Sequence, residues 1–312
     1  MEQKSFGKLA DGEGATLYTI SNTKGMCAQI TDFGAAIVSL VVKDKNGKDT
    51  DVVLGYEDAQ TYQQQTASFG AIVGRNCNRI ADAQIVINDV TYQLERNDNE
   101  NNLHSGSQAT SRRLWDVEEH TANKVTFVIE DADGQQGYPG NAVMKVTYEV
   151  TEADELSITY HATADKTTVF NMTNHAYFNL CGKGKKITEH RLHIPADRIL
   201  DTTPAFIPTG KRMNVKNTPF DFTSLKPIGT DLYADHEQLL WNKGYNHCYI
   251  LKDEISVEML EAASLYEPVT GRNMTVMTDL PAVLLYTAGY YERPDTAVCL
   301  ETQFYPLSLI HI

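Results

Sequence analysis

The decapeptide NMTNHAYFNL at residues 171–180 combines residue types that transfer protons and bind hydroxyl groups. If it forms a strand, successive side chains alternate between two faces. The polar face then carries His175, Tyr177 and Asn179, and the apolar face carries Ala176, Phe178 and Leu180. An imidazole titrates near neutral pH and can act as a general acid or base. The decapeptide therefore predicts one wall of a polar site.

Four further segments place polar groups where a β-protein would be expected to keep apolar residues or plain turns. In VCLETQFYP (298–306), Glu301 and Gln303 lie on the face opposite to Leu300 and Thr302. The other three segments are VGRNCNRIA (73–81) with Arg75 and Arg79, NDNENNLHSG (97–106) with Asn102 and His104, and GYNHCYIL (244–251) with Asn246 and His247. Taken singly, each of these side chains is more often structural than catalytic.

The residues alone leave three chemistries open. His104, His175, His247 and Glu301 are zinc-ligand types, but no H-x-H, H-x₃-H or H-E-x-x-H spacing occurs, so no metal is predicted. No G-x-S-x-G sequence occurs, which disfavours a serine nucleophile. Paired carboxylates for glycoside cleavage stay open, with Glu301 in the most suggestive context.

Short alternating segments separated by turn residues must position these groups. Strand pairs are predicted at 38–55 around Asn46-Gly47, at 83–94 around Asn88-Asp89 and at 145–162, with further strands at 124–131 and 273–289. Short helices are predicted within 57–65 and 231–242. No β-α-β alternation appears, so the pattern predicts one large all-β domain, an antiparallel β-sandwich.

The composition limits the partners and the compartment. The 312 residues carry a net charge of −14, which argues against nucleic acid and anionic membranes and allows a neutral or a cationic small molecule. The five cysteines are scattered and never spaced as C-x-x-C, which is typical of free thiols in a reducing compartment. No secretory signal and no membrane span are apparent, so a cytoplasmic location is expected. The oligomeric state is left open.

Together the segments resemble the galactose mutarotase (aldose 1-epimerase) family. The resemblance spans nearly the whole chain in the family's order, and TNHAYFNL (173–180) and LETQ (300–303) are its most specific motifs. The other matching segments are DVVLGY (51–56), GRNCNRIA (74–81), NNLHSG (101–106), GYPGN (137–141), IPADRILDTTPAFIPTG (194–210), TPFDF (218–222), GYNHCYIL (244–251) and PAVLLYTAG (281–289).

The resemblance implies a β-sandwich of the galactose mutarotase type, a monosaccharide substrate and no cofactor. It implies that Glu301 is the general base for the anomeric hydroxyl, that His175 is the general acid for the ring oxygen, and that His104 assists near the ring oxygen. It also implies sugar contacts by four residues: Arg75, Asn246, Tyr177 and Asn102. The expected activity is the interconversion of the α and β anomers of free hexoses such as galactose and glucose.

The sequence departs from the family pattern at three places inside the chain. Asn246 stands where the family usually has Asp, and Leu284 stands where it often has Gln. SQATSRRLW (107–115) replaces a glycine-rich continuation after NNLHSG. The first two changes keep two other hypotheses open: a non-catalytic sugar-binding or regulatory protein of the same fold, and an epimerase for a phosphorylated or uncommon aldose.

The last residues form a separate departure. LSLIHI (307–312) matches the translation of a sequencing-transposon end, so residues 307–312 are expected to be an artefact that replaces a native C-terminal strand. The whole chain, 1–312, is otherwise predicted to be a single aldose 1-epimerase domain.

Overall fold

The computed structural model describes residues 2–253 and 257–306 of the chain. The chain divides into two compact units. Unit 1 contains residues 2–42 and 55–175, and unit 2 contains 43–54 and the described part of 176–306. The expectation for residues 307–312 lies outside the described residues, and the single-domain assignment stays a prediction.

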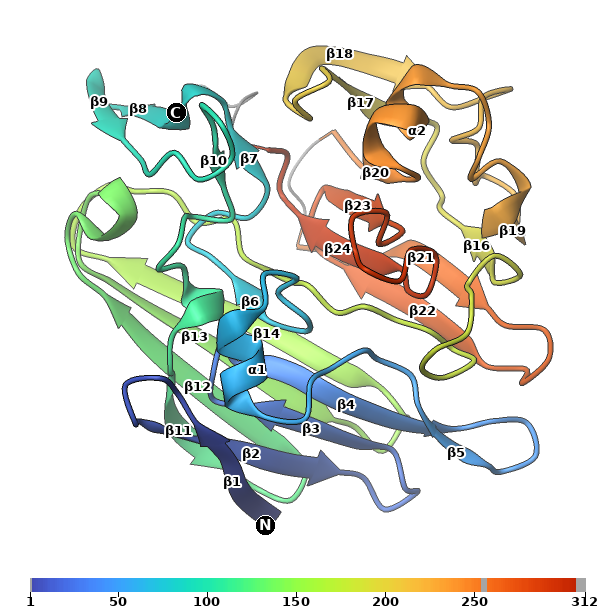
Figure 1. The fold of residues 1–312 in the computed structure, drawn as a ribbon, viewed down its shortest axis with the longest axis horizontal. Helices are drawn as coiled ribbons and strands as arrows, with labels where there is room; N and C mark the ends of the chain where they lie inside the picture. The colour runs from blue at the N-terminus through green and yellow to red at the C-terminus, as the bar shows by residue number, and fades with distance from the viewer. Residues whose placement is uncertain (1, 254–256, 307–312) are drawn as a thin grey trace. The chain divides into compact units, whose positions relative to one another are not determined.

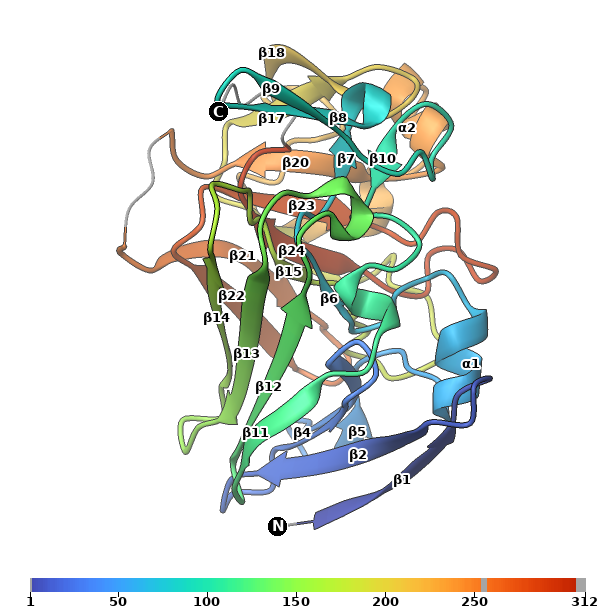
Figure 2. The ribbon, with the colours of Figure 1, turned by 90° about the vertical axis from the view of Figure 1, so that its left-hand side faces the viewer.

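Unit 1 is built mainly from antiparallel strands that follow one another in sequence (Figures 1 and 2). One group comprises β1 (Glu2–Lys8), β2 (Gly14–Ser21), β3 (Cys27–Thr31) and β4 (Ala36–Lys43). A second sheet has the order β11-β12-β13-β14. Its strands are β11 (Asp116–His120), β12 (Lys124–Asp131), β13 (Ala142–Val150) and β14 (Leu156–Ala164).

Aromatic side chains join these two sheets in the core of unit 1. On β13 every second residue is buried, as expected for a strand with one face in the core. The ring of Tyr18 on β2 lies 5.6 Å from that of Phe127 on β12, in an edge-to-face arrangement. The hydroxyl of Tyr148 on β13 donates to the carbonyl of Ala35 at 2.7 Å, which satisfies its polar end inside the core.

Short elements of unit 1 carry or adjoin the candidate site residues of this unit. They are α1 (Ala59–Gln64), β6 (Ile72–Val73), β7 (Arg79–Ile80), β8 (Gln84–Ile87), β9 (Val90–Gln93), β10 (Asn102–Leu103) and β15 (Thr173–Asn174). β15 pairs with β6 and β10 pairs with β7, so these two-stranded pairs bring together segments that lie far apart in the sequence. They hold the loops that follow them, which contain His104 and His175.

Unit 2 contains a five-stranded antiparallel sheet with the order β18-β17-β20-β23-β24 and a four-stranded sheet with the order β19-β16-β21-β22. The five strands are β18 (Pro208–Asn214), β17 (Arg198–Thr202), β20 (Asn246–Ile250), β23 (Ala282–Tyr286) and β24 (Cys299–Gln303). The four strands are β19 (Lys226–Pro227), β16 (Arg191–His193), β21 (Leu260–Tyr266) and β22 (Asn273–Thr278). Unit 2 also holds β5 (Asp49–Asp51) and α2 (Glu237–Asn242).

Most of the predicted elements are confirmed. β8 and β9 are joined through Asn88 and Asp89, both with positive φ, as a tight hairpin turn requires. β13 pairs with β14, β12 is a strand, and both predicted helices are present. The turn after β4 differs, because only Gly47 has a positive φ there and the side chain of Asp44 accepts bonds from two backbone amides of residues 44–48.

The prediction of one continuous strand over 171–180 is wrong. Only Thr173–Asn174 is a strand, because the chain leaves unit 1 after His175 and enters unit 2 at Ala176. Backbone groups of His175 bond to Gly70 and Ala71 of unit 1, and the amide of Asn179 bonds to Val52 of unit 2. In the described ranges, no helix is both long and apolar enough to cross a membrane.

Candidate active site

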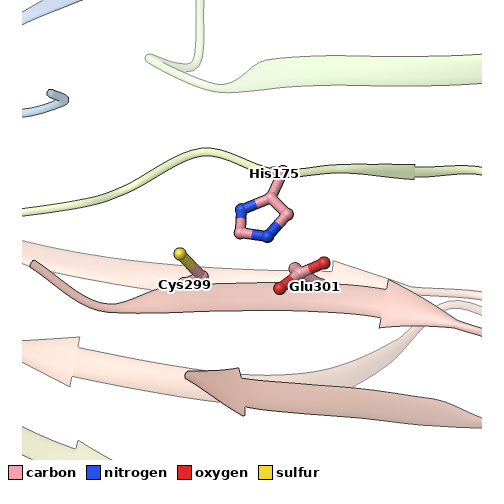
Figure 3. Close-up of side chains that lie close together, drawn as sticks. All are labelled: His175, Cys299 and Glu301. Carbon is pink, nitrogen blue, oxygen red and sulfur yellow. The ribbon is translucent and has the colours of Figure 1, made fainter. Parts of the chain in front are cut away.

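Glu301 is the central acidic group of the five-stranded sheet in unit 2. It lies in the middle of β24, directly opposite Leu284 on β23, while Gln303 lies opposite Ala282. This register confirms that Glu301 and Gln303 share a face, and Figure 3 shows Cys299 and Glu301 projecting to the same side of β24. Only 1% of Glu301 is exposed. Burial disfavours the charged form and raises the pKa of Glu301 to about 8.

The electrostatic influence of Glu301 reaches other groups on the same sheet face. Burial, followed by the nearby charge of Glu301, raises the pKa of the Cys299 thiol well above its usual range. Burial also raises the pKa of Cys248 to about 12; a hydrogen bond from Gln303 opposes this rise and the charge of Glu301 adds to it. The thiols therefore stay protonated at neutral pH, and Glu301 ionises before either of them as the pH rises.

His175 ends the unit 1 part of its segment. Its backbone amide donates to the carbonyl of Ala71, and its carbonyl accepts from the amide of Gly70, both at 2.9 Å. These bonds extend the pairing between β15 and β6 by one residue and fix the direction of the side chain. His175 is buried, and burial lowers its pKa to about 4.

His104 lies beside His175 within unit 1. The two ring centroids are 5.5 Å apart and the rings meet edge to face at 74°. The backbone amide of Asn78 donates to Nδ1 of His104 at 3.1 Å, so the neutral ring carries its proton on Nε2. Burial, followed by the charges of His175 and Arg79, holds the pKa of His104 well below its usual range. His104 is therefore a neutral hydrogen-bond donor through Nε2.

The guanidinium of Arg75 is buried in an internal network of unit 1. A guanidinium has five N–H donors, and here all of them have acceptors. Nε donates to Asp131 Oδ2 at 2.6 Å, and Nη1 donates to the carbonyl of Pro139 at 2.8 Å and to Thr168 Oγ1 at 3.3 Å. Nη2 donates to the carbonyls of Asp131 and Gly140 at 3.1 and 2.8 Å. These contacts indicate a bracing role, and sugar binding by Arg75 stays a prediction.

The other predicted sugar-binding residues lie in different surroundings. Asn102 is buried on β10, and its amide donates to the carbonyl of Glu95 at 2.8 Å. Tyr177 is buried in unit 2, where its ring lies 6.1 Å from that of Tyr286 in an edge-to-face arrangement. Asn246 is half-buried at the start of β20, opposite Tyr286.

Unit 1 thus brings the rings of His104 and His175 together, and it also contains Arg75 and Asn102. Unit 2 places Glu301 and Asn246 on one sheet face.

Sequence reasoning missed two contributors, the backbone amide of Asn78 and the carboxylate of Asp131. Asp131 is 56 positions from Arg75, so no local pattern indicates this pair. Cys299 was detectable, because alternation places it on the face of Glu301. Cys299 and Glu301 both carry metal-binding atoms, and the expectation of no metal stays a prediction.

This all-β structure, with a buried carboxylic acid and an imidazole pair, defines a protein equipped for acid–base chemistry. The family model described as aldose 1-epimerase matches residues 16–312. The chain therefore belongs to the aldose 1-epimerase family, and it is an isomerase of that family.

Individual relatives agree with this assignment. The aldose 1-epimerase of Escherichia coli (strain K12) is 34% identical over 311 residues, covering 96% of this chain and 89% of its own length. The galactose mutarotase of Mus musculus is 35% identical over 316 residues, covering 97% and 90%.

Solved structures confirm the predicted fold. The galactose 1-epimerase from Lactobacillus acidophilus NCFM is similar with a TM-score of 0.86 and 26% identity, covering 99% of this chain and 92% of that one. The GalM/aldose epimerase homologue from C. elegans gives a TM-score of 0.85 and 29% identity, covering 94% and 90%. The chain thus has the antiparallel β-sandwich fold of the galactose mutarotase type.

Proposed function

We propose that the chain interconverts the α and β anomers of free hexoses, with galactose and glucose as substrates, by acid–base opening of the sugar ring. The observation that carries this proposal is Glu301. A carboxyl group on an apolar sheet face with a pKa of about 8 is a stronger base than an exposed carboxylate. Such a base suits the removal of a proton from a weakly acidic hydroxyl at neutral pH.

The reaction uses one base and one acid in turn. Glu301 takes the proton from O1 while the C1–O5 bond breaks and the C1=O1 bond forms. His175 gives a proton to O5, which becomes the C5 hydroxyl. After rotation about C1–C2, neutral His175 takes the proton back from the C5 hydroxyl while O5 attacks the other face of C1. Glu301 returns its proton to O1, which closes the ring as the other anomer. No atom or electron is gained or lost, so the balanced cycle needs only this pair.

The protonation states of the two groups are linked to sugar binding. Without a sugar, burial favours protonated Glu301 and neutral His175. Catalysis needs the carboxylate and the imidazolium, a combination with the same total number of protons. A hydrogen bond from the anomeric hydroxyl to Glu301 stabilises the carboxylate, so substrate binding favours the reactive form. His104 supports the step by donating from Nε2 toward the ring oxygen.

The remaining predicted residues hold the sugar hydroxyls in this proposal. Asn246 supplies an amide on the face of Glu301, Tyr177 packs beside Tyr286 on the same unit, and Asn102 supplies a buried amide from unit 1. The substrate is a small monosaccharide. We place the chain in the cytoplasm, because all five cysteines are free thiols.

Polarimetry of freshly dissolved α-D-galactose tests the function. The chain is expected to speed the approach to the equilibrium rotation, and Glu301→Gln is expected to abolish this effect while galactose binding changes only a few-fold. Glu155→Gln, at an exposed turn of unit 1, is the matched control and should keep full activity. A folded chain that binds galactose without accelerating its mutarotation would instead be the non-catalytic sugar-binding protein.

A further inference from the structure

The turn that carries His104 has a left-handed backbone over three consecutive residues. His104, Ser105 and Gly106 have φ angles of 54°, 66° and 96°. This conformation suits glycine, but a residue with a Cβ atom keeps it only where the surrounding structure enforces it. The turn follows β10 directly, and only 1% of Ser105 is exposed. Contacts with neighbouring segments must therefore hold His104 and Ser105 in place.

Segment 76–78, which leads into β7, makes these contacts within unit 1. The backbone amide of Asn76 donates to Ser105 Oγ at 2.8 Å, and this hydroxyl lies 3.0 Å from the carbonyl oxygen of Asn76, to which it can donate. The amide of Asn78 donates to Nδ1 of His104, and the amide of His104 donates to the carbonyl of Asn78, both at 3.1 Å. Each of the two turn residues is thus held by both backbone polar groups of one residue in the segment.

The hydroxyl of Ser105 also joins the turn to the buried network around Arg75. Tyr138 Oη lies 3.2 Å from Ser105 Oγ, and the guanidinium carbon of Arg75 lies 5.7 Å from the centre of the Tyr138 ring. A hydroxyl has one proton and two lone pairs, so its three contacts match its full hydrogen-bonding capacity. Asn76 and Tyr138 are buried as well. Removal of the hydroxyl would therefore take away the partner of a buried amide and a buried carbonyl, which is costly.

We infer that Ser105 is a positioning residue for the acid–base reaction. Its hydroxyl holds the left-handed turn that keeps Nδ1 of His104 at the amide of Asn78, and this leaves Nε2 as the donor of the ring. The bonds of Ser105 go to the backbone of Asn76 and to Tyr138, so Ser105 acts on the reaction through His104. The effect on catalysis rests on the proposed function, in which His104 donates toward the ring oxygen.

The position of the proton on His104 tests this inference without any sugar. Long-range ¹H–¹⁵N NMR of a chain labelled with ¹⁵N-histidine distinguishes protonated from unprotonated ring nitrogens, and His104→Gln identifies the signals. In the unmodified chain at pH 7, Nδ1 should be unprotonated and Nε2 protonated. In Ser105→Ala the two nitrogen signals should move toward each other, because the loosened turn allows both tautomers. Unchanged signals in Ser105→Ala overturn the inference.

Kinetics test the consequence for catalysis. Ser105→Ala should lower kcat for galactose about 10- to 100-fold, since a displacement of about 1 Å at a catalytic group can cost about 100-fold. KM should change by less than about threefold, because the lost bonds are not made to the sugar. An unchanged kcat, or a loss confined to KM, contradicts the positioning role.

Thr126→Val is the matched control for the loss of a buried hydroxyl. Thr126 lies on β12 in the same unit, and its Oγ1 is 2.9 Å from Oγ1 of Thr147. This variant should lower the melting temperature but keep kcat and the NMR signals of His104. If the control loses as much kcat as Ser105→Ala, general destabilisation explains both effects and the inference is wrong.

Hydrogen exchange on the unmodified chain tests the same bonds even if Ser105→Ala fails to fold. The amides of Asn76 and Asn78 should exchange at least about 100-fold more slowly than in an unfolded peptide, and fast exchange of either overturns the inference. Failure of the proposed function is distinguishable from failure of this inference. A folded chain that does not accelerate mutarotation contradicts the proposed function, while the NMR and exchange results still test the positioning. An active chain whose Ser105→Ala variant keeps its kcat and its signals contradicts only the inference.

Discussion

Replacing Glu301 with glutamine should alter the stability of the chain in a pH-dependent way. Glutamine keeps the shape of the side chain but cannot ionise. In the folded chain the pKa of Glu301 is raised from 4.5 to about 8, because burial disfavours the carboxylate. The contribution of protonated Glu301 to stability is therefore fully present below pH 4.5. It is lost as the pH rises toward 8, since the unfolded chain ionises first.

The raised pKa sets the magnitude of this effect. Between 4.5 and about 8 the shift is roughly 3.5 pH units, and each unit corresponds to about 1.36 kcal/mol. The free energy of unfolding of the unmodified chain should thus fall by about 5 kcal/mol relative to that of Glu301→Gln across this range. Above pH 8 the difference should be constant, because Glu301 is then ionised in both states.

Urea unfolding curves of both proteins at half-unit steps from pH 4.5 to 9 measure this difference. The pKa values of about 8 for Glu301 and about 4 for His175 predict that kcat/KM for galactose is flat between pH 4 and 8, because the reactive carboxylate–imidazolium pair carries the same number of protons as the resting pair. Above pH 8 it should fall tenfold per pH unit, because the pair then lacks the proton that His175 must give. A stability difference that does not change with pH refutes the assignment of a buried, largely uncharged Glu301. A kcat/KM that rises tenfold per pH unit from pH 5 to 8 refutes the need for a protonated His175 beside the carboxylate of Glu301.

Two further substitutions test the surroundings of the site. Asn246→Asp should lower KM for galactose a few-fold, because a carboxylate makes stronger, charge-assisted bonds to hydroxyl groups; an unchanged or higher KM shows that Asn246 does not hold the sugar. Asp131→Asn should lower the free energy of unfolding by about 3–5 kcal/mol, because it leaves the buried guanidinium of Arg75 without its ionic partner. Glu118→Gln, which breaks a more exposed ion pair with Lys145, is its control and should cost less than about 1 kcal/mol. Equal losses in these two variants, compared by thermal and urea unfolding, contradict the bracing role of Arg75.

Local patterns were sufficient to predict most of the strands. Alternation fixed the faces of β13 and β24, and Asn88-Asp89 marked the turn between β8 and β9, because these features depend on neighbouring residues alone. The same reasoning failed for residues 171–180. His175 and Asn179 are buried in two different units, and a division into two units leaves no trace in the period of a ten-residue window.

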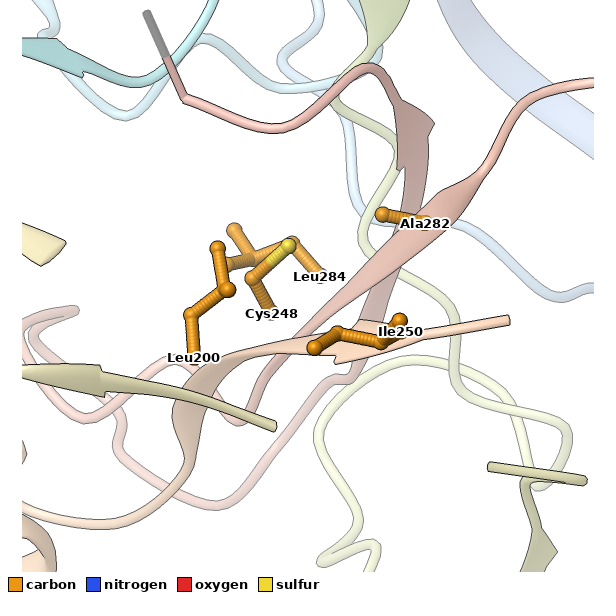
Figure 4. Packing of buried hydrophobic residues seen from close by; sticks show 5 residues of the cluster. All are labelled: Leu200, Cys248, Ile250, Ala282 and Leu284. Carbon is orange, nitrogen blue, oxygen red and sulfur yellow. The ribbon is translucent and has the colours of Figure 1, made fainter. Parts of the chain in front are cut away.

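The sequence was sufficient to predict which residue types form the candidate site, but it was not sufficient to predict their pKa values or their hydrogen-bond partners. Glu301 was found as a carboxylate on a strand, but its raised pKa depends on its burial. The strands beside it, with Leu284 and then Cys248 in register (Figure 4), come from other parts of the sequence. The proton position on His104 depends on the backbone amide of Asn78, which every residue except proline carries and which no pattern reveals. The network around Arg75 likewise consists mostly of backbone carbonyls.

The split of unit 2 between residues 43–54 and the C-terminal half bears on how the chain folds as it leaves the ribosome. Val53 pairs with Phe178, which follows it by 125 residues. At about 5–20 residues per second, the partner emerges about 6–25 s later. During this interval the buried apolar residues Val52, Val53 and Leu54 have no native partner from the later half, although most of unit 1 is being synthesised in the same period. Nascent chains stalled between residues 60 and 175 should therefore be the species most dependent on chaperones.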